Sequence, residues 1–184
     1  MYMKQFFLLF ISFFTIALVS PVFAEKADFE KATDIAADQM TYDDVKQINT
    51  FTGNVVLNRG SLILKAGRVV VTQDRSGYQN ATMYAAPGVL ATFRQRRDGG
   101  LNLWVEGEAE RIEYDGRADL VKLFSKAKLR RLEGTRPTDE IEGEFISYDS
   151  RAEFISVNNN SPGSKSGTGR IKAVIQPRLG VKEK

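Results

Sequence analysis

Hydrophobic and polar residues alternate along most of this chain, and the stretch 49–71, NTFTGNVVLNRGSLILKAGRVVV, shows the pattern most clearly. It contains two apolar, β-branched runs separated by a polar turn with a glycine at 58–61. In the first run Phe51, Val55 and Leu57 fall on one side, opposite polar residues, which is the period of a half-buried strand. The stretch therefore predicts a β-hairpin with one buried face.

Similar runs follow along the chain with turn residues between them, about every 8 to 12 residues, which is the rhythm of an all-β sandwich, barrel or roll. No stretch sustains an apolar period of 3.6 residues, so we expect little helix, with a short helix at 29–33 as an alternative. Gly-containing segments such as 97–100 and 133–137 predict turns. We predict strands at 33–37, 39–42, 48–58, 62–72, 81–86, 89–95, 101–106, 109–114, 120–131, 140–146, 152–157 and 171–175.

The first residues lack this alternation. A single positive charge, Lys4, precedes an apolar run, and small residues surround Phe23 where the run ends. These features are typical of a signal peptide cleaved after Ala24; the alternative, a membrane anchor, needs a run of ~20 apolar residues, longer than this one. A polar segment at 158–169 predicts a long loop before the last strand. We expect a cleaved signal peptide at 1–24, one β domain at 25–176 and a flexible tail at 177–184.

Charge and composition narrow the function. The chain has 26 Lys and Arg against 23 Asp and Glu, and the basic residues are scattered, so we expect no nucleic-acid partner. It has no histidine and no cysteine, which excludes His-based catalysis, His- or Cys-based metal sites and disulfides. Carboxylate pairs remain, but Glu106, Glu108 and Glu110 alternate as on a solvated strand face. We expect neither enzymatic activity nor a cofactor or metal.

A short pattern recurs three times, as ADQMTYD at 37–43, AERIEYD at 109–115 and GEFISYD at 143–149. Each copy reads as a strand with an aspartate that opens a turn. A longer strand follows the first two copies, and Gly53 in the first of these predicts a bulge or a close approach. The second carries Phe-Ser-Lys-Ala at 124–127 without glycine, which weakens the prediction of a bulge there.

These repeats, together with FTGNV at 51–55, LKAGRVVV at 64–71, ATF at 91–93 and VEG at 105–107, resemble the OstA-like family of periplasmic lipopolysaccharide-transport bridge proteins of the LptA type. The resemblance covers about 35–175. It implies an antiparallel, twisted, V-shaped β jelly roll with two facing sheets and open ends, located in the periplasm. It also implies head-to-tail stacking of copies by edge-strand pairing, with lipopolysaccharide carried in an apolar groove. The implied partners are lipopolysaccharide, further copies of this chain, an inner-membrane component of the same fold and the amino-terminal domain of an outer-membrane translocon.

Strand alternation selects the residues that would line such a groove. Exposing an acyl chain to water costs ~0.8 kcal/mol per CH₂, so the lining must be continuous and apolar. The same residues could instead fill an ordinary packed core, which is the usual outcome for an all-β domain. The predicted lining consists of Ile35, Tyr42, Phe51, Val55, Leu57, Leu64, Val69, Val71, Met83, Phe93, Ile112, Tyr114, Leu129, Ile146 and Tyr148.

Lipid phosphates would have to stay at the mouth of the groove and meet basic side chains. Arg68, Arg94 and Lys128 lie in strands and are the candidates, because guanidinium and ammonium groups bind phosphate. Solubilising surface charge is the simpler interpretation of each. A β-roll interaction or carbohydrate-binding module of the periplasm that holds no lipid is the alternative function.

Overall fold

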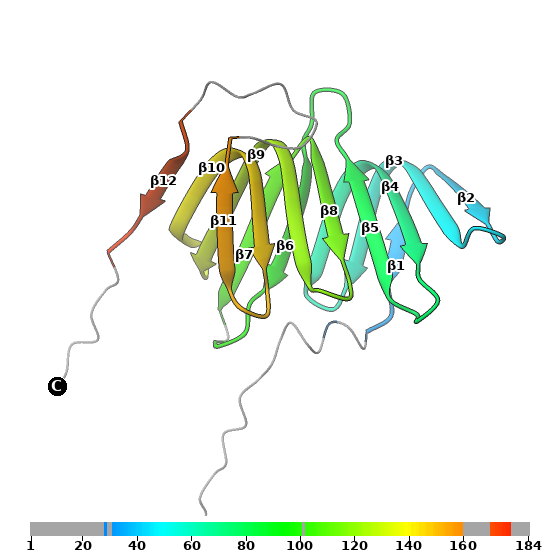
Figure 1. Cartoon of the computed structure of the whole chain (residues 1–184), viewed down its shortest axis with the longest axis horizontal. Helices are drawn as coiled ribbons and strands as arrows, with labels where there is room; N and C mark the ends of the chain where they lie inside the picture. Colours follow the sequence, from blue (N-terminus) through cyan, green and yellow to red (C-terminus); the bar gives the residue numbers. More distant parts are fainter. Residues whose placement is uncertain (1–27, 29–30, 101, 160–169, 178–184) are drawn as a thin grey trace, which may run out of the picture.

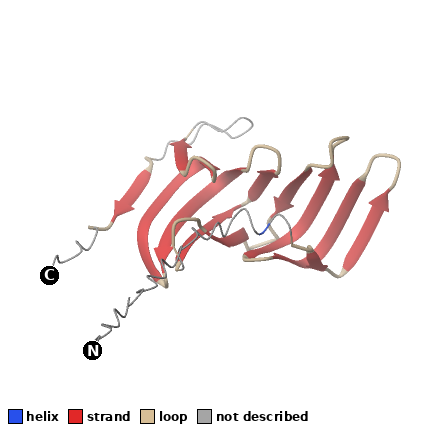
Figure 2. Cartoon of the chain, turned by 90° about the horizontal axis from the view of Figure 1, so that it is seen from below, coloured by secondary structure: helices blue, strands red, loops and turns tan. Residues whose placement is uncertain are grey.

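A computed structural model gives the fold (Figure 1), and it describes residues 28, 31–100, 102–159 and 170–177. The predicted signal peptide, most of the predicted 158–169 loop and residues 178–184 of the predicted tail lie outside the described residues. Over the described part of the chain, no helix is long and apolar enough to cross a membrane. Figure 2 shows strands lying side by side as almost all of the regular structure.

The described residues form twelve strands, one for each predicted strand. The main difference lies at 133–137, where the predicted turn is too long. Only Gly134 and Thr135 turn, and Pro137 already belongs to the following strand. The strands are β1 (Asp34–Ala36), β2 (Gln39–Asp43), β3 (Ile48–Arg59), β4 (Leu62–Gln73), β5 (Gln79–Tyr84), β6 (Ala91–Arg96), β7 (Leu103–Ala109), β8 (Arg111–Asp115), β9 (Leu120–Glu133), β10 (Arg136–Asp149), β11 (Phe154–Asn158) and β12 (Lys172–Ile175).

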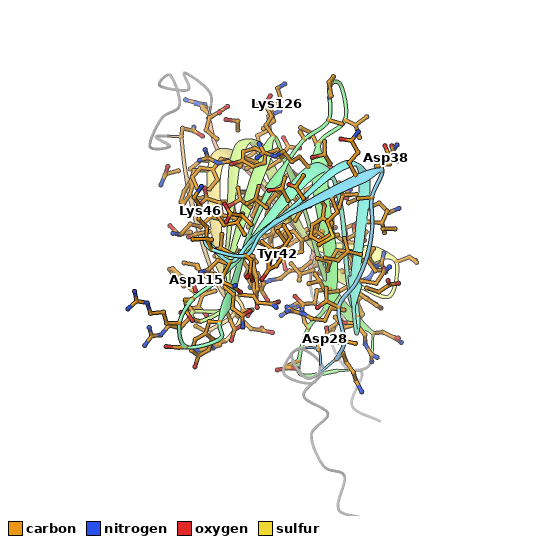
Figure 3. All side chains as sticks on the ribbon, turned by 90° about the vertical axis from the view of Figure 1, so that its right-hand side faces the viewer. Asp28, Asp38, Tyr42, Lys46, Asp115 and Lys126 are labelled. Carbon is orange, nitrogen blue, oxygen red and sulfur yellow. The ribbon has the colours of Figure 1, made fainter. Side chains whose placement is uncertain are left out.

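The pairing is antiparallel throughout and folds the strands into two facing sheets. The long strands β3, β4, β9 and β10 cross a crease and contribute one half to each sheet. The first sheet has the order β2-β3-β4-β5-β8-β9-β10-β11. The second has the order β1-β3-β4-β6-β7-β9-β10-β12. Viewed along the roll in Figure 3, the sheets converge near Asp38 and Lys126 and diverge toward the opposite side, so the predicted V-shaped jelly roll is confirmed.

Left-handed residues make the crease. In β3, Gly53 has φ +83° and Asn54 has φ +45°, and the register with β4 shifts at this point. In β9, Ser125 and Lys126 take φ +61° and +54°, opposite a register shift in β10. The predicted bulge at Gly53 is confirmed. The absence of glycine at 124–127 weakened the prediction of a second bulge there, and this expectation is wrong, because β9 also bends at Ser125 and Lys126. The fold imposes the bend there on two residues that carry side chains.

Close packing explains why glycine stands at position 53. The amide of Asp38, in the link between β1 and β2, donates to the Gly53 carbonyl at 3.0 Å. The Asn54 side-chain amide donates to the Asp38 carboxylate at 2.9 Å. A Cβ atom on Gly53 would lie 2.2 Å from Asp38 Oδ2 and 2.9 Å from its Cβ. The crease therefore needs a residue without a side chain at the point where the edge link crosses it.

The interior is fully packed with side chains next to the crease. Side chains from both sheets meet there, and Val69, Ile112, Leu123 and Ile146 are completely inaccessible to solvent. Removing a large apolar side chain of this kind from water contributes ~1.5–3 kcal/mol. Toward the diverging side the sheets separate, and the packing gives way to the cavity described below.

Each end of the roll is a strand edge. At one end β1 and β2 pair only with β3 among the described strands, and at the other end β11 and β12 pair only with β10. Inner-face apolar residues are exposed at both ends. Tyr42, opposite Asn49, is 52% exposed, and Ile175, opposite Asp139, is 75% exposed. Among the described residues, none covers the interior of the roll at its two ends.

Candidate functional site

A cavity of about 220 Å³ lies between the two sheets on their diverging side. One wall comes from the first sheet through β3, β4, β5, β8 and β9, and the other from the second sheet through β1, β3, β4 and β6. Most of its surface is aliphatic or aromatic. The cavity is lined by Thr33, Ile35, Asn49, Phe51, Leu57, Arg59, Leu62, Leu64, Val71, Gln79, Ala81, Phe93, Gln95, Tyr114 and Val121.

The structure divides the predicted lining residues into three groups. The first borders the cavity and consists of Ile35, Phe51, Leu57, Leu64, Val71, Phe93 and Tyr114. The second is buried in the solid core and consists of Val55, Val69, Met83, Ile112, Leu129, Ile146 and Tyr148. Tyr42 stands alone at the open end of the roll, where its hydroxyl donates to the Asp44 carboxylate at 2.8 Å and Figure 3 shows it between the two sheets.

Polar residues on the cavity wall were missed by the apolar pattern. Asn49, Gln79 and Gln95 all line the cavity, although none follows the hydrophobic alternation. Their positions in the sequence could have predicted that they line the cavity, because each lies two residues from an apolar lining residue and so faces the same way. These amides give the wall hydrogen-bonding groups close to its open side.

The open side of the V is narrowed by contacts between the sheets. Near β1, the Arg59 guanidinium of the second sheet lies 5.7 Å from the ring centre of Tyr114 in the first sheet. Further along, Arg97 Nη2 lies 2.6 Å from Glu153 Oε2, and Arg131 Nη2 donates to the Glu153 carbonyl at 2.7 Å. The opening is therefore crossed by basic side chains of one sheet that reach the other.

Tyr114 is a neutral hydrogen-bonding group at this opening. Burial raises the pKa of its hydroxyl far above the ordinary value, although Arg59 nearby lowers it. The hydroxyl donates to Asp119 Oδ1 at 3.3 Å, and Asp119 is also paired with Arg151. The phenol therefore stays protonated at all physiological pH values and offers a donor.

Asp28 is bound to the second sheet beside this opening. Asp28 is 5% exposed, and its carboxylate accepts hydrogen bonds from the Ser61 amide at 2.7 Å, the Ser61 hydroxyl at 2.6 Å and Gln95 Nε2 at 3.3 Å. A Cβ on Gly60 would lie 2.0 Å from Asp28 Oδ1, so the turn between β3 and β4 is shaped to receive this carboxylate. Asp28 thereby holds the chain next to the cavity wall.

The three predicted phosphate ligands lie away from the cavity. Arg68 lies 5.5 Å from the ring centre of Tyr84. Arg94 Nη1 lies 2.6 Å from Glu106 Oε1, and its guanidinium carbon is 4.4 Å from the ring centre of Trp104. None of the three borders the cavity, so their contact with phosphate stays a prediction.

Lys128 and Arg94 belong to rows of alternating charge across the second sheet. Lys128 Nζ lies 2.9 Å from Glu140 and 3.0 Å from Glu142, and Arg130 pairs with Glu106 at 3.4 Å. The hydrogen bond to Glu140 raises the pKa of Lys128, and the hydrogen bond from Lys128 lowers the pKa of Glu142. Glu106 of β7 thus pairs with Arg94 and Arg130 on the two neighbouring strands. Over the described residues, no cluster of acidic side chains is arranged to hold a metal ion.

The fold and the site define the class of the protein as a twisted, antiparallel β jelly roll whose two facing sheets enclose an apolar cavity. The chain matches the model of the family described as LptA/(LptD N-terminal domain) LPS transport protein over residues 34–154, and it belongs to that family. The family resemblance of the sequence is thereby confirmed.

Two curated relatives carry the name lipopolysaccharide export system protein LptA. The protein of Haemophilus influenzae is 33% identical over 114 residues, which cover 62% of this chain and 65% of that protein. The protein of Escherichia coli strain K12 is 34% identical over 121 residues, which cover 66% of this chain and 64% of that protein. The chain thus spans somewhat less than two thirds of these relatives.

A solved structure has the same fold. It is the crystal structure of LptH from Pseudomonas aeruginosa, described as the LptA-homologous periplasmic component of the conserved lipopolysaccharide transport device. The TM-score is 0.70 at 27% sequence identity, and the match covers 82% of this chain and 99% of that chain.

Proposed function

We propose that this protein is a periplasmic, non-enzymatic carrier of lipopolysaccharide that holds acyl chains between its two sheets. The observation that carries the proposal is the apolar cavity, which remains open where an ordinary two-sheet protein would be packed. Family membership supports the choice of lipid, since the curated relatives are named for lipopolysaccharide export. Each CH₂ of an acyl chain that enters the cavity contributes ~0.8 kcal/mol of binding free energy, whatever the exact structure of that acyl chain.

Site-directed photo-crosslinking tests this proposal. A photoreactive phenylalanine analogue at Phe93, 5% exposed on the cavity wall, is expected to capture lipopolysaccharide in cells. The same analogue at Glu108, which belongs to the other face of the second sheet, is the matched control and is expected to capture none. Equal capture at both positions, or capture at neither, contradicts binding between the sheets.

We further propose that copies stack head to tail, with the β1–β2 edge of one copy against the β11–β12 edge of the next. The two edges carry unpaired backbone groups, and the exposed inner-face residues Tyr42 and Ile175 would be covered by the neighbouring interior. A heterologous contact of this kind does not close on itself, so it produces growing chains. The same edges would meet an inner-membrane component of the same fold and the amino-terminal domain of an outer-membrane translocon.

Sedimentation velocity over a range of concentrations tests the stacking. Proline at Ile155 or at Ser156 removes one amide of β11, and adjacent amides in a strand point to opposite edges. One of the two variants is therefore expected to keep the pairing with β10 and lose the oligomers. Wild-type protein that stays monomeric at high concentration would refute the stacking.

A further inference from the structure

A polar pocket of about 440 Å³ adjoins the apolar cavity at the opening of the V. The two share Thr33, Arg59, Gln79 and Tyr114 on their walls, so an elongated molecule can occupy both at once. The polar pocket is completed by Lys31, Tyr78 and two glycines, and none of the described residues that line it is acidic. An apolar space thus continues into a polar space that is lined by cations.

We propose that this polar pocket is a phosphate site for an amphiphile whose acyl chain fills the cavity, with Arg59 as the main ligand and Lys31 as the second. The proposal rests on the proposed function, because it assumes that the cavity holds a lipid chain. It assigns the phosphate to the mouth between the sheets instead of to the outward cations Arg68, Arg94 and Lys128.

The donors around the pocket suit a phosphate group. The Arg59 guanidinium can present two parallel N–H groups to two phosphate oxygens, and the Lys31 ammonium adds a point charge. The Gln79 amide supplies a neutral donor from the opposite sheet, where the Tyr114 hydroxyl already donates its single proton to Asp119. Phosphate oxygens can accept several hydrogen bonds at once, so donors from both sheets can act together.

Nearby carboxylates do not cancel this charge. Asp119, which accepts from Tyr114, is paired with Arg151. Asp28, which touches the turn after Arg59, already accepts three hydrogen bonds from Ser61 and Gln95. Asp119 is therefore paired with a cation of its own, Asp28 is held by neutral donors, and neither carboxylate lines the pocket, whose charged lining side chains among the described residues are Arg59 and Lys31.

Arg59 also lies where the chain of the lipid must pass. Its guanidinium faces the Tyr114 ring across the opening. In Figure 3 the open side of the roll lies between Asp115 and Asp28. A bound phosphate would hold the guanidinium in the polar pocket and leave the space beside the ring for the chain. The contact between the two sheets would then be replaced by contacts of both sheets with the ligand.

Calorimetric titration of the purified chain with three probes tests the site. The probes are decyl phosphate, decyl maltoside as a neutral amphiphile of equal chain length, and inorganic phosphate, with both amphiphiles kept below their micelle concentrations. The variants are Arg59→Gln, Arg59→Lys and Lys31→Gln, and Arg68→Gln is the matched control on the outer face. Lys31 is exposed, so Lys31→Gln tests the site even if a substitution at Arg59 destabilises the turn that follows it.

Arg59→Gln is expected to weaken decyl phosphate binding by about 10- to 100-fold, as for a charge-assisted bidentate contact. Lys31→Gln is expected to weaken it less, Arg59→Lys to recover part of it, and Arg68→Gln to leave it unchanged. Decyl maltoside binding is expected to be equal in wild type, Lys31→Gln and Arg68→Gln, and to change less than decyl phosphate binding in the Arg59 variants, because Arg59 also borders the apolar cavity. Unchanged decyl phosphate binding in both Gln variants at the pocket, or a loss in Arg68→Gln alone, overturns the site while the carrier function stands.

Two further outcomes separate the possibilities. Wild-type protein that binds neither amphiphile refutes the carrier function and the phosphate site with it. Inorganic phosphate that binds as tightly as decyl phosphate overturns the assignment to a lipid and makes the pocket a site for the free anion.

Discussion

Replacing Gly53 by valine should destabilise the roll at its crease. Gly53 has φ +83°, and the left-handed region costs a residue with a Cβ ~1–2 kcal/mol. The new Cβ would also lie 2.2 Å from Asp38 Oδ2. Moving the Asp38 side chain aside breaks its hydrogen bond from Asn54, a further loss of ~1 kcal/mol. We expect a total of about 2–3 kcal/mol, or a fall in Tm of roughly 4–12 °C for a domain of this size.

Urea unfolding of Gly53→Val beside Gly88→Val measures the contribution of the crease. Gly88 has φ +78° but no atom within 4 Å of a Cβ built there, so its substitution adds only the backbone strain. The difference between the two variants isolates the contact with Asp38. Equal destabilisation would refute the role of Gly53 as a point of close approach.

Three other predictions follow from the same structure. Ser125→Gly should leave the free energy of unfolding unchanged or raise it by up to about 1 kcal/mol, while Ser125→Val lowers it, because Ser125 holds φ +61°; equal effects in urea unfolding would contradict the strain. Asp28→Ala should lower the free energy of unfolding by about 2–3 kcal/mol because Ser61 and Gln95 lose their acceptor, and Asp28→Asn should recover part of the loss. A melting temperature that does not change in Asp28→Ala would show that these hydrogen bonds do not stabilise the fold. Lys128 lowers the pKa of Glu142, so the pair stabilises the fold at neutral pH and loses this effect as the pH falls below about 4.3. Lys128→Met should therefore reduce the fall in the free energy of unfolding between neutral and acid pH, whereas Lys46→Met should not. The same fall in wild type and both variants would refute the coupling.

The position of each strand follows from local pattern, and the sequence predicts it well. Alternation around Phe51 and Val55 places both residues inward whatever lies opposite, because successive side chains of a strand point to opposite faces. The pattern is less informative where a strand bends. The bulge at Ser125 has no local signal, since it arises where β9 must pass from one sheet to the other opposite β10.

Burial at the candidate site depended on the distance between the sheets. Phe93 and Val69 have the same inward pattern, yet Phe93 borders the cavity and Val69 is fully enclosed near the crease. Tyr42 faces inward as predicted and is nonetheless exposed, because β2 is an edge strand at the open end of the roll. No periodicity in a single strand encodes how far away the opposite sheet lies.

Local sequence patterns were enough to predict the all-β class, the strands along the chain and the inward side of each strand, because these depend on residues a few positions apart. It also determined that histidine and cysteine chemistry is excluded and, through the repeats and short matches, which family the chain resembles. The three-dimensional structure was needed to show which inward residues face open space, and that Arg59 and Tyr114 meet across the opening from distant strands. These features depend on the divergence of two sheets from a shared crease, which is a property of the whole roll and not of any segment.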